Sequence, residues 1–164
     1  MPESNLSAEE ASTPYADLTR PDTIVLISQP PDQTCAVVGG IMALRMQKLG
    51  ARGIIVDGRV RDLSALRELG IPVWSRGTSV VGAGAETRFH AKEVAVRIGG
   101  VEVRPGDFVV VDEEEGGVVV CPRERVGEVL GLLAGEEGLV GRDGRVVEWV
   151  EKGGSVREGF EMFR

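Results

Sequence analysis

The chain has 164 residues, of which 42% are hydrophobic and 27% are charged, and its formal net charge is −7. This size suits one globular domain with a core of its own. The acidic balance disfavours a nucleic-acid-binding protein, because neutralising phosphates takes clustered Lys and Arg side chains. No apolar run approaches the roughly 20 residues that span a bilayer, and no secretory signal pattern is present, so no membrane partner is expected. Two cysteines, Cys35 and Cys121, lie far apart without a CxxC pattern, which predicts reduced thiols and a cytoplasmic location.

Residues 1–20 are polar and show no periodicity. Such a composition cannot bury enough apolar surface to offset the entropy of ordering, so we expect a disordered leader. The remaining residues, 21–164, are predicted to form a single domain.

Strands and helices alternate in the first half of this domain. Strands are expected at residues 23–28, 53–56 and 71–75, and helices at 40–49 and 62–69. Asp62 stands where it could cap the second helix, and Gly70 where it would end it. Such a βαβαβ order predicts neighbouring parallel strands joined by right-handed crossovers.

The second half changes character. Valine-rich segments flank Gly99-Gly100, which predicts a hairpin, and two more strands are expected at 108–111 and 118–121. A helix is expected over 122–133, followed by a helical tail over 145–164 that is interrupted at Gly153-Gly154. The predicted fold class is therefore α/β, with a parallel βαβαβ half and a β-hairpin half.

Gly39-Gly40 marks the entry to the first of these helices. The first amides of a helix, here including those of Ile41 and Met42, have no intrahelical acceptor and can bind a carboxylate. Glycine also lets a ligand approach the backbone closely. The alternative is a tight turn that binds nothing.

Arg61-Asp62 follows the second predicted strand, and ligands of open α/β sheets collect at the carboxyl ends of strands. Arg61 could hold a substrate carboxylate with its planar guanidinium. Asp62 offers the hard oxygen that Mg²⁺ or Mn²⁺ prefers. The alternative is that Asp62 only caps its helix while Arg61 faces solvent.

The spacing of the two pairs could bring them to one edge of the sheet. Backbone donors, a guanidinium and a metal-binding carboxylate would then surround a small 2-oxo acid. A metal chelated by the keto and carboxylate oxygens would stabilise the enolate formed when a C–C bond breaks.

At this point the sequence resembles the RraA-like family. The family pattern, a glycine followed after twenty residues by Arg-Asp, is present as Gly40 and Arg61-Asp62 within GIIVDGRVRD. The segments LRELGIPVWSRG and VRPGDFVVVDEEEGGVVVCP are also similar to the family. The resemblance covers roughly residues 21–133.

This resemblance implies a layered β/β/α swivelling-domain fold and a metal-dependent lyase with Mg²⁺ or Mn²⁺ as cofactor. The reaction would be that of a 4-hydroxy-4-methyl-2-oxoglutarate aldolase or an oxaloacetate decarboxylase, which release pyruvate. It implies that the amides of Gly39, Gly40, Ile41 and Met42 bind the substrate carboxylate. Arg61 would bind substrate and stabilise the enolate, and Asp62 would ligate the metal. A homotrimer or homohexamer with sites at subunit interfaces is implied as well.

Two departures from the family pattern affect these expectations. Gly40 stands where active aldolases often carry an acidic residue, so a second metal-binding carboxylate is missing. The family usually has helices and turns before the first strand, so we expect this domain to lack that N-terminal segment. A neighbouring subunit could supply a carboxylate, for which Glu148 and Glu151 are candidates. His90 is expected at the surface.

Two alternatives to the lyase function remain. The protein could be a non-catalytic regulator of an RNase E-like partner, or a catalytically silent paralogue.

Overall fold

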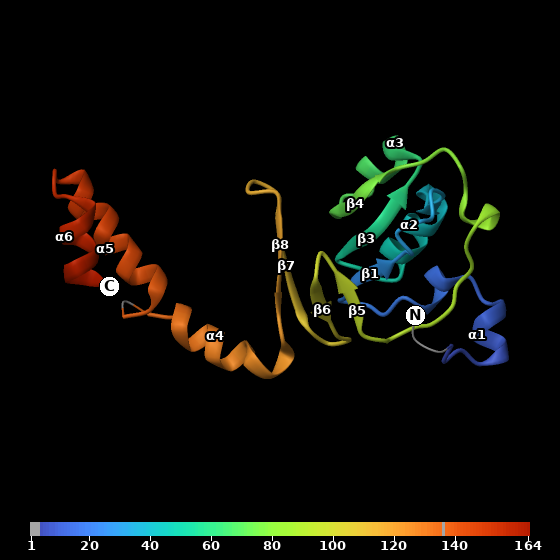
Figure 1. Ribbon diagram of the computed structural model, residues 1–164, viewed down its shortest axis with the longest axis horizontal. Coiled ribbons are helices and arrows are strands. Elements are labelled where there is room, and N and C mark those ends of the chain that lie inside the picture. The colour runs from blue at the N-terminus through green and yellow to red at the C-terminus, as the bar shows by residue number, and fades with distance from the viewer. Residues whose placement is uncertain (1–3, 136) are drawn as a thin grey trace. The chain divides into compact units, whose positions relative to one another are not determined.

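The computed structural model describes residues 4–135 and 137–164 (Figure 1). The chain divides into two compact units, an N-terminal unit that ends at Pro105 and a C-terminal unit, Gly106–Arg164. The single domain expected over 21–164 stays a prediction, since compact units need not be separate domains. The boundary lies at a Pro-Gly turn in which Gly106 has a φ of 91°, a left-handed conformation that glycine adopts without strain.

The N-terminal unit is built on a four-stranded parallel sheet. Its strands are β1 (Ile24–Ser28), β2 (Ala36–Val38), β3 (Gly53–Val60) and β4 (Val73–Thr78). β3 pairs with all three others. Since β4 pairs along the length of β3, β1 and β2 follow one another along the opposite edge of β3. The predicted parallel arrangement is confirmed, although β2, which is only three residues long, was not predicted.

Two helices, α2 (Gly40–Lys48) and α3 (Leu63–Arg67), follow β2 and β3. α2 is buried through Ala43 and Met46, and α3 through Leu66. These side chains join one hydrophobic core with strand residues such as Ile54. Burying aliphatic side chains stabilises the fold by about 1.5–3 kcal/mol each. The core fixes the beginning of each helix next to the carboxyl end of a strand.

The leader is folded where the sequence predicted disorder. It contains α1 (Ala8–Ser12) and the 3-10 turn η1 (Tyr15–Leu18). Ser7 and Glu10 form a capping box at the start of α1, in which each side chain accepts the other residue's backbone N–H. Ala16 is only 1% exposed and belongs to the core. One buried residue and a capping box order a segment whose overall composition is polar.

The rest of the N-terminal unit contains the 3-10 turn η2 (Ala83–Ala85) and a hairpin of β5 (Val96–Ile98) and β6 (Val101–Val103). The hairpin predicted at Gly99-Gly100 is confirmed. After η2, the Glu86 carboxylate accepts the N–H groups of Thr34 and Cys35. These hydrogen bonds lower the pKa of Glu86 and tie the loop before β2 to the turn after η2.

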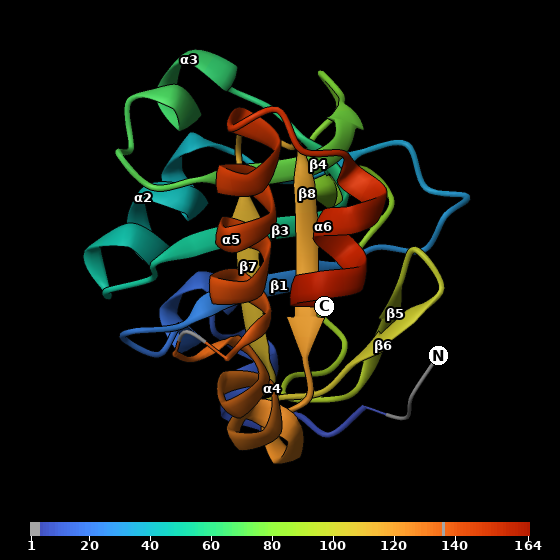
Figure 2. The ribbon, with the colours of Figure 1, turned by 90° about the vertical axis from the view of Figure 1, so that its left-hand side faces the viewer.

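The C-terminal unit begins with an antiparallel hairpin of β7 and β8, as predicted, and continues with helices. The elements are β7 (Phe108–Asp112), β8 (Gly117–Cys121), η3 (Arg123–Arg125), α4 (Val126–Leu133), α5 (Leu139–Glu151) and α6 (Val156–Phe163). α5 starts earlier than expected, but the break after it confirms the predicted interruption. α5 and α6 lie side by side in Figure 2, and an ion pair of 2.7 Å joins Arg164 to Asp143.

None of the helices within residues 4–135 and 137–164 combines the length and the apolar character needed to cross a membrane.

Candidate functional site

The Gly39-Gly40 pair lies at the junction of β2 and α2. Gly39 is the N-cap of α2 and has no side chain to bind the first amides of the helix. The Gly40 N–H instead donates to Oδ2 of Asp62 over 2.9 Å. Helix geometry leaves the next amides, those of Ile41 and Met42, without an intrahelical acceptor. The start of α2 is therefore a group of backbone donors beside one carboxylate.

Asp62 lies between β3 and α3 in a left-handed conformation, with φ 63° and ψ 48°. This conformation is uncommon for a residue with a side chain, although Asp and Asn tolerate it best. The sequence predicted that Asp62 caps α3, but its side chain makes no hydrogen bond to that helix. It caps α2 instead, through Gly40. A strained backbone at this position is typical of functional sites.

Arg61 lies on the same loop and contacts the same elements. Its backbone N–H donates to the carbonyl oxygen of Val38 over 2.9 Å. Its Nη1 lies 3.7 Å from Oδ1 of Asp62. The two side chains are 47% and 42% exposed, so the guanidinium and the carboxylate are both open to a ligand in solvent.

The two glycines are needed because other groups approach the backbone closely. A Cβ on Gly39 would lie 2.8 Å from Oδ2 of Asp62 and 3.0 Å from Nε of Arg61. A Cβ on Gly40 would lie 2.9 Å from Cβ of Ala65 in α3. Any larger residue would therefore displace either the Arg61 and Asp62 side chains or α3.

A groove of about 520 Å³ opens from this point between α2 and α3. Its walls combine polar groups near Gly40 and Asp62 with aliphatic side chains such as Ile41 and Leu44. Ile41 is 82% exposed. The charged side chains that line it are Lys48, Asp62 and Glu68, and Arg61 is not among the lining residues.

Other residues singled out in the sequence are not among those that line the groove. His90 is exposed, as expected. Glu148 and Glu151 lie on α5 in the C-terminal unit, where Glu148 pairs with Lys152 over 3.6 Å. The sequence did not single out Ala65, whose small side chain permits the approach of α3 to Gly40.

The family resemblance implies a divalent metal, and the donor atoms can be compared with that expectation. Oδ2 of Asp62 already accepts the Gly40 N–H, which leaves Oδ1 for a metal ion. Within residues 4–135 and 137–164, no three His, Cys, Asp or Glu side chains are grouped to hold an ion. Mg²⁺ takes only one or two protein carboxylates and keeps several waters. Asp62 therefore fits a largely hydrated Mg²⁺.

Comparison with family models gives a match to the RraA-like model, described as Aldolase/RraA, over residues 8–120. A protein of Halalkalibacterium halodurans named "Putative 4-hydroxy-4-methyl-2-oxoglutarate aldolase" is 34% identical over 110 residues. That alignment covers 67% of this chain and 51% of the relative. The chain thus spans about half the length of this relative.

Two solved structures have the same fold. An uncharacterized protein from Pseudomonas syringae pv. tomato matches with a TM-score of 0.80 and 25% identity, over 96% of this chain and 70% of that one. Streptomyces coelicolor RraAS2, described as an unusual member of the RNase ES inhibitor RraA protein family, matches with a TM-score of 0.64 and 32% identity. That match covers 71% of this chain and 58% of RraAS2. With a family model that matches more than half of its residues, this α/β chain belongs to the RraA-like family.

Proposed function

We propose that this chain is a divalent-metal-dependent lyase that cleaves a C–C bond in a 2-oxo acid and releases pyruvate. The observation that carries this proposal is the hydrogen bond between the Gly40 N–H and Asp62, with the Arg61 guanidinium beside it. Backbone donors, a cation and a metal-binding carboxylate suit a 2-oxo acid. The aldolase name of the Halalkalibacterium halodurans relative supports the same reaction class.

The amides at the start of α2 would bind the substrate carboxylate. Those of Ile41 and Met42 have no acceptor within the helix, and the positive end of the helix dipole favours an anion there. The adjacent glycines let the Arg61 and Asp62 side chains approach this backbone closely. Arg61 would hold the keto oxygen, or a second carboxylate oxygen, with its planar donors.

Cleavage moves the electron pair of the broken C–C bond onto the keto oxygen, which becomes an enolate oxygen. Arg61 would stabilise the negative charge that develops there. A Mg²⁺ or Mn²⁺ ion held by Asp62 would act as a Lewis acid toward the same oxygen. The leaving fragment departs as CO₂ in a decarboxylation. In an aldol cleavage it departs as a carbonyl compound, and the proton of its former hydroxyl group passes to water. A proton from water then completes pyruvate.

The proposal is tested by measuring pyruvate release from a panel of 2-oxo acids that includes oxaloacetate and 4-hydroxy-4-methyl-2-oxoglutarate. Turnover is expected with Mg²⁺ or Mn²⁺ and should disappear on addition of EDTA, because Lewis-acid stabilisation of the enolate is lost. The background reaction of each substrate with metal alone is the control. Release of pyruvate that EDTA leaves unchanged would contradict a metal-dependent mechanism.

We also propose that the site is completed at an interface between copies of this chain, as a homotrimer or homohexamer. Asp62 is a single carboxylate, and the exposed Ile41 and Leu44 beside it form an apolar surface suited to a partner. Light scattering of the purified protein should give a mass of three or six chains. A protein that is monomeric by light scattering and still turns over oxaloacetate would contradict an interfacial site.

A second candidate function is binding to an RNase E-like protein without catalysis. The observation that favours it is the distribution of charge. The C-terminal unit, Gly106–Arg164, holds twice as many acidic as basic residues, so the whole formal net charge of −7 falls there. An acidic unit favours association with a basic surface on a partner. A protein that inhibits such a nuclease but releases no pyruvate in the substrate panel would support this candidate over the lyase.

A further inference from the structure

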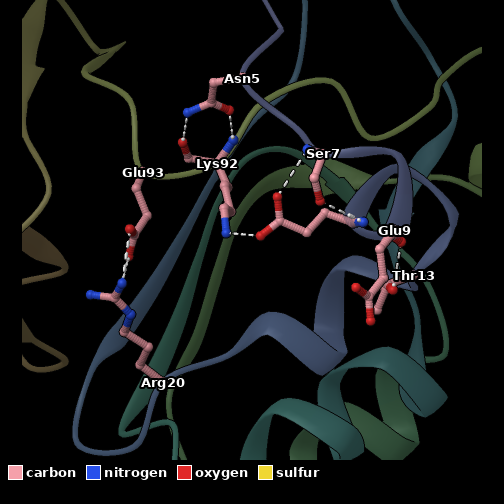
Figure 3. A network of polar contacts seen from close by, with 8 residues as sticks. Asn5, Ser7, Glu9, Thr13, Arg20, Lys92 and Glu93 are labelled. Atoms are coloured by element: carbon pink, nitrogen blue, oxygen red, sulfur yellow. Dashed lines mark hydrogen bonds and ion pairs between the residues drawn. The ribbon is translucent and has the colours of Figure 1, made fainter.

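The N-terminal segment Asn5–Arg20 is tied to residues near the end of a long loop, more than 70 positions later in the chain (Figure 3). The Asn5 amide exchanges two hydrogen bonds with the backbone of Lys92, over 2.7 and 3.0 Å. The Lys92 ammonium pairs with Glu10, which lowers the pKa of that carboxyl to about 2. Arg20 forms an ion pair of 2.8 Å with Glu93, the residue after Lys92. The segment is therefore held on both sides of α1 and η1.

This segment places a tyrosine next to β2. Tyr15, the first residue of η1, donates its hydroxyl proton to the carbonyl oxygen of Val37. Its ring packs against Phe89, with ring centroids 6.1 Å apart. Burial raises the pKa of Tyr15 to about 12, so the hydroxyl remains a donor at neutral pH. On the other side of η1, Asp17 pairs with Arg45 of α2 over 2.6 Å.

The hydrogen bond from Tyr15 reaches the backbone just before the candidate site. Val37 lies in β2, a three-residue strand whose register with β3 shifts between Ala36 and Val38. The next carbonyl oxygen, that of Val38, accepts the Arg61 N–H. Two residues further on, the Gly40 N–H binds Asp62.

We propose that Tyr15 is a positioning residue for this site. Its hydroxyl group holds the peptide group that follows Val37. This contact fixes the next stretch of backbone, in which the Val38 carbonyl oxygen accepts the Arg61 N–H and the Gly40 N–H donates to Asp62. The segment Asn5–Arg20 keeps the tyrosine in place. The consequence for substrate binding rests on the proposed lyase function, whereas the consequence for the backbone at Gly40 does not.

The first test is the isosteric variant Tyr15→Phe, which removes the hydroxyl and retains the ring. With Mg²⁺ present, oxalate serves as a probe because it is a planar dianion shaped like the enolate of pyruvate. Calorimetric titration should show oxalate binding about three- to tenfold more weakly, the usual effect of one lost hydrogen bond. The KM for oxaloacetate should rise by a similar factor, while kcat changes less than about twofold.

The matched control is Thr19→Val, which removes another hydroxyl hydrogen bond of the same segment. Thr19 Oγ1 donates to the Ala16 carbonyl oxygen over 2.8 Å, so this hydrogen bond stays within the segment. Thr19→Val should bind oxalate like the unmodified protein. Equally weakened oxalate binding in both variants would mean that the segment acts only through its packing, and this would overturn a specific role for Tyr15. Unchanged oxalate binding in Tyr15→Phe would overturn that role as well.

Hydrogen exchange of single amides tests the inference without any substrate. In Tyr15→Phe the Gly40 and Arg61 amides should exchange several-fold faster, while amides in α5 should not change. Glu10→Gln removes the half-buried ion pair with Lys92 and should act on the same two amides in the same direction. Unaltered exchange at both amides in both variants would overturn the inference.

If the unmodified protein neither binds oxalate nor releases pyruvate, the lyase proposal fails. The exchange data alone then decide whether Tyr15 is a positioning residue.

Discussion

Replacing Asp62 by alanine should lower metal-dependent turnover of oxaloacetate by about a hundredfold or more, because the proposed metal ligand is removed. The same change removes the acceptor for the Gly40 N–H and puts alanine in a left-handed conformation. The free energy of unfolding should therefore fall by about 1–3 kcal/mol. Steady-state kinetics and thermal unfolding measure the two effects on the same preparation.

Asp62→Asn separates the two roles of this side chain. Asparagine keeps an oxygen that can accept the Gly40 N–H and tolerates the left-handed backbone. It lacks the negative charge that a hard cation requires. This variant should be nearly as stable as the unmodified protein and nearly as inactive as Asp62→Ala. Full activity in Asp62→Asn would leave the hydrogen bond to α2 as the sole role of residue 62 and would remove the metal site from the proposal.

Gly39→Ala is the second change for which we expect a large effect. The new Cβ would lie 2.8 Å from Oδ2 of Asp62 and 3.0 Å from Nε of Arg61, so both side chains must move. Gly39 has an extended backbone, with φ −126° and ψ 178°, which alanine adopts readily. Because Oδ2 of Asp62 also accepts the Gly40 N–H, the free energy of unfolding should fall by about 1 kcal/mol. The kcat/KM should fall by about ten- to a hundredfold, since a displacement near 1 Å can cost that much.

Gly82→Ala is the matched control for this substitution. Gly82 also lies in the N-terminal unit, has a negative φ of −78°, and a Cβ there would have no neighbour within 4 Å. Its kcat/KM and its unfolding temperature should equal those of the unmodified protein. If Gly39→Ala also retained full kcat/KM, the close approach of Arg61 and Asp62 to this loop would be irrelevant to turnover.

Local patterns predicted most of the regular structure. β-branched runs predicted strands at 23–28 and 53–56, and the structure has Ile24–Ser28 and the longer Gly53–Val60 there. Glycines after the apolar periods marked the ends of α2 and α3, where Gly50 and Gly70 have positive φ. These signals depend on neighbouring residues only. β2 escaped prediction because three residues carry no periodicity.

The folded leader escaped prediction for a different reason. Its polar composition indicated disorder, yet Ser7 and Glu10 match a helix-capping pattern that was visible in the sequence. What orders the segment is long-range: Ala16 enters the core, and Asn5 and Glu10 bind Lys92. Contacts between residues so far apart cannot be read from local composition. The division into two units likewise depends on which elements contact one another.

By itself, the sequence determined the family pattern of Gly40 and Arg61-Asp62, because spacing and residue type are properties of the chain alone. Only the tertiary structure decided what Asp62 binds. Its position before α3 suggested a cap for that helix, but a left-handed backbone and the parallel sheet bring its carboxylate to the start of α2. Tertiary structure also decided that Tyr15, far from the site in sequence, donates to the backbone just before Gly39. Hydrogen bonds between distant segments form only after the core has brought those segments together.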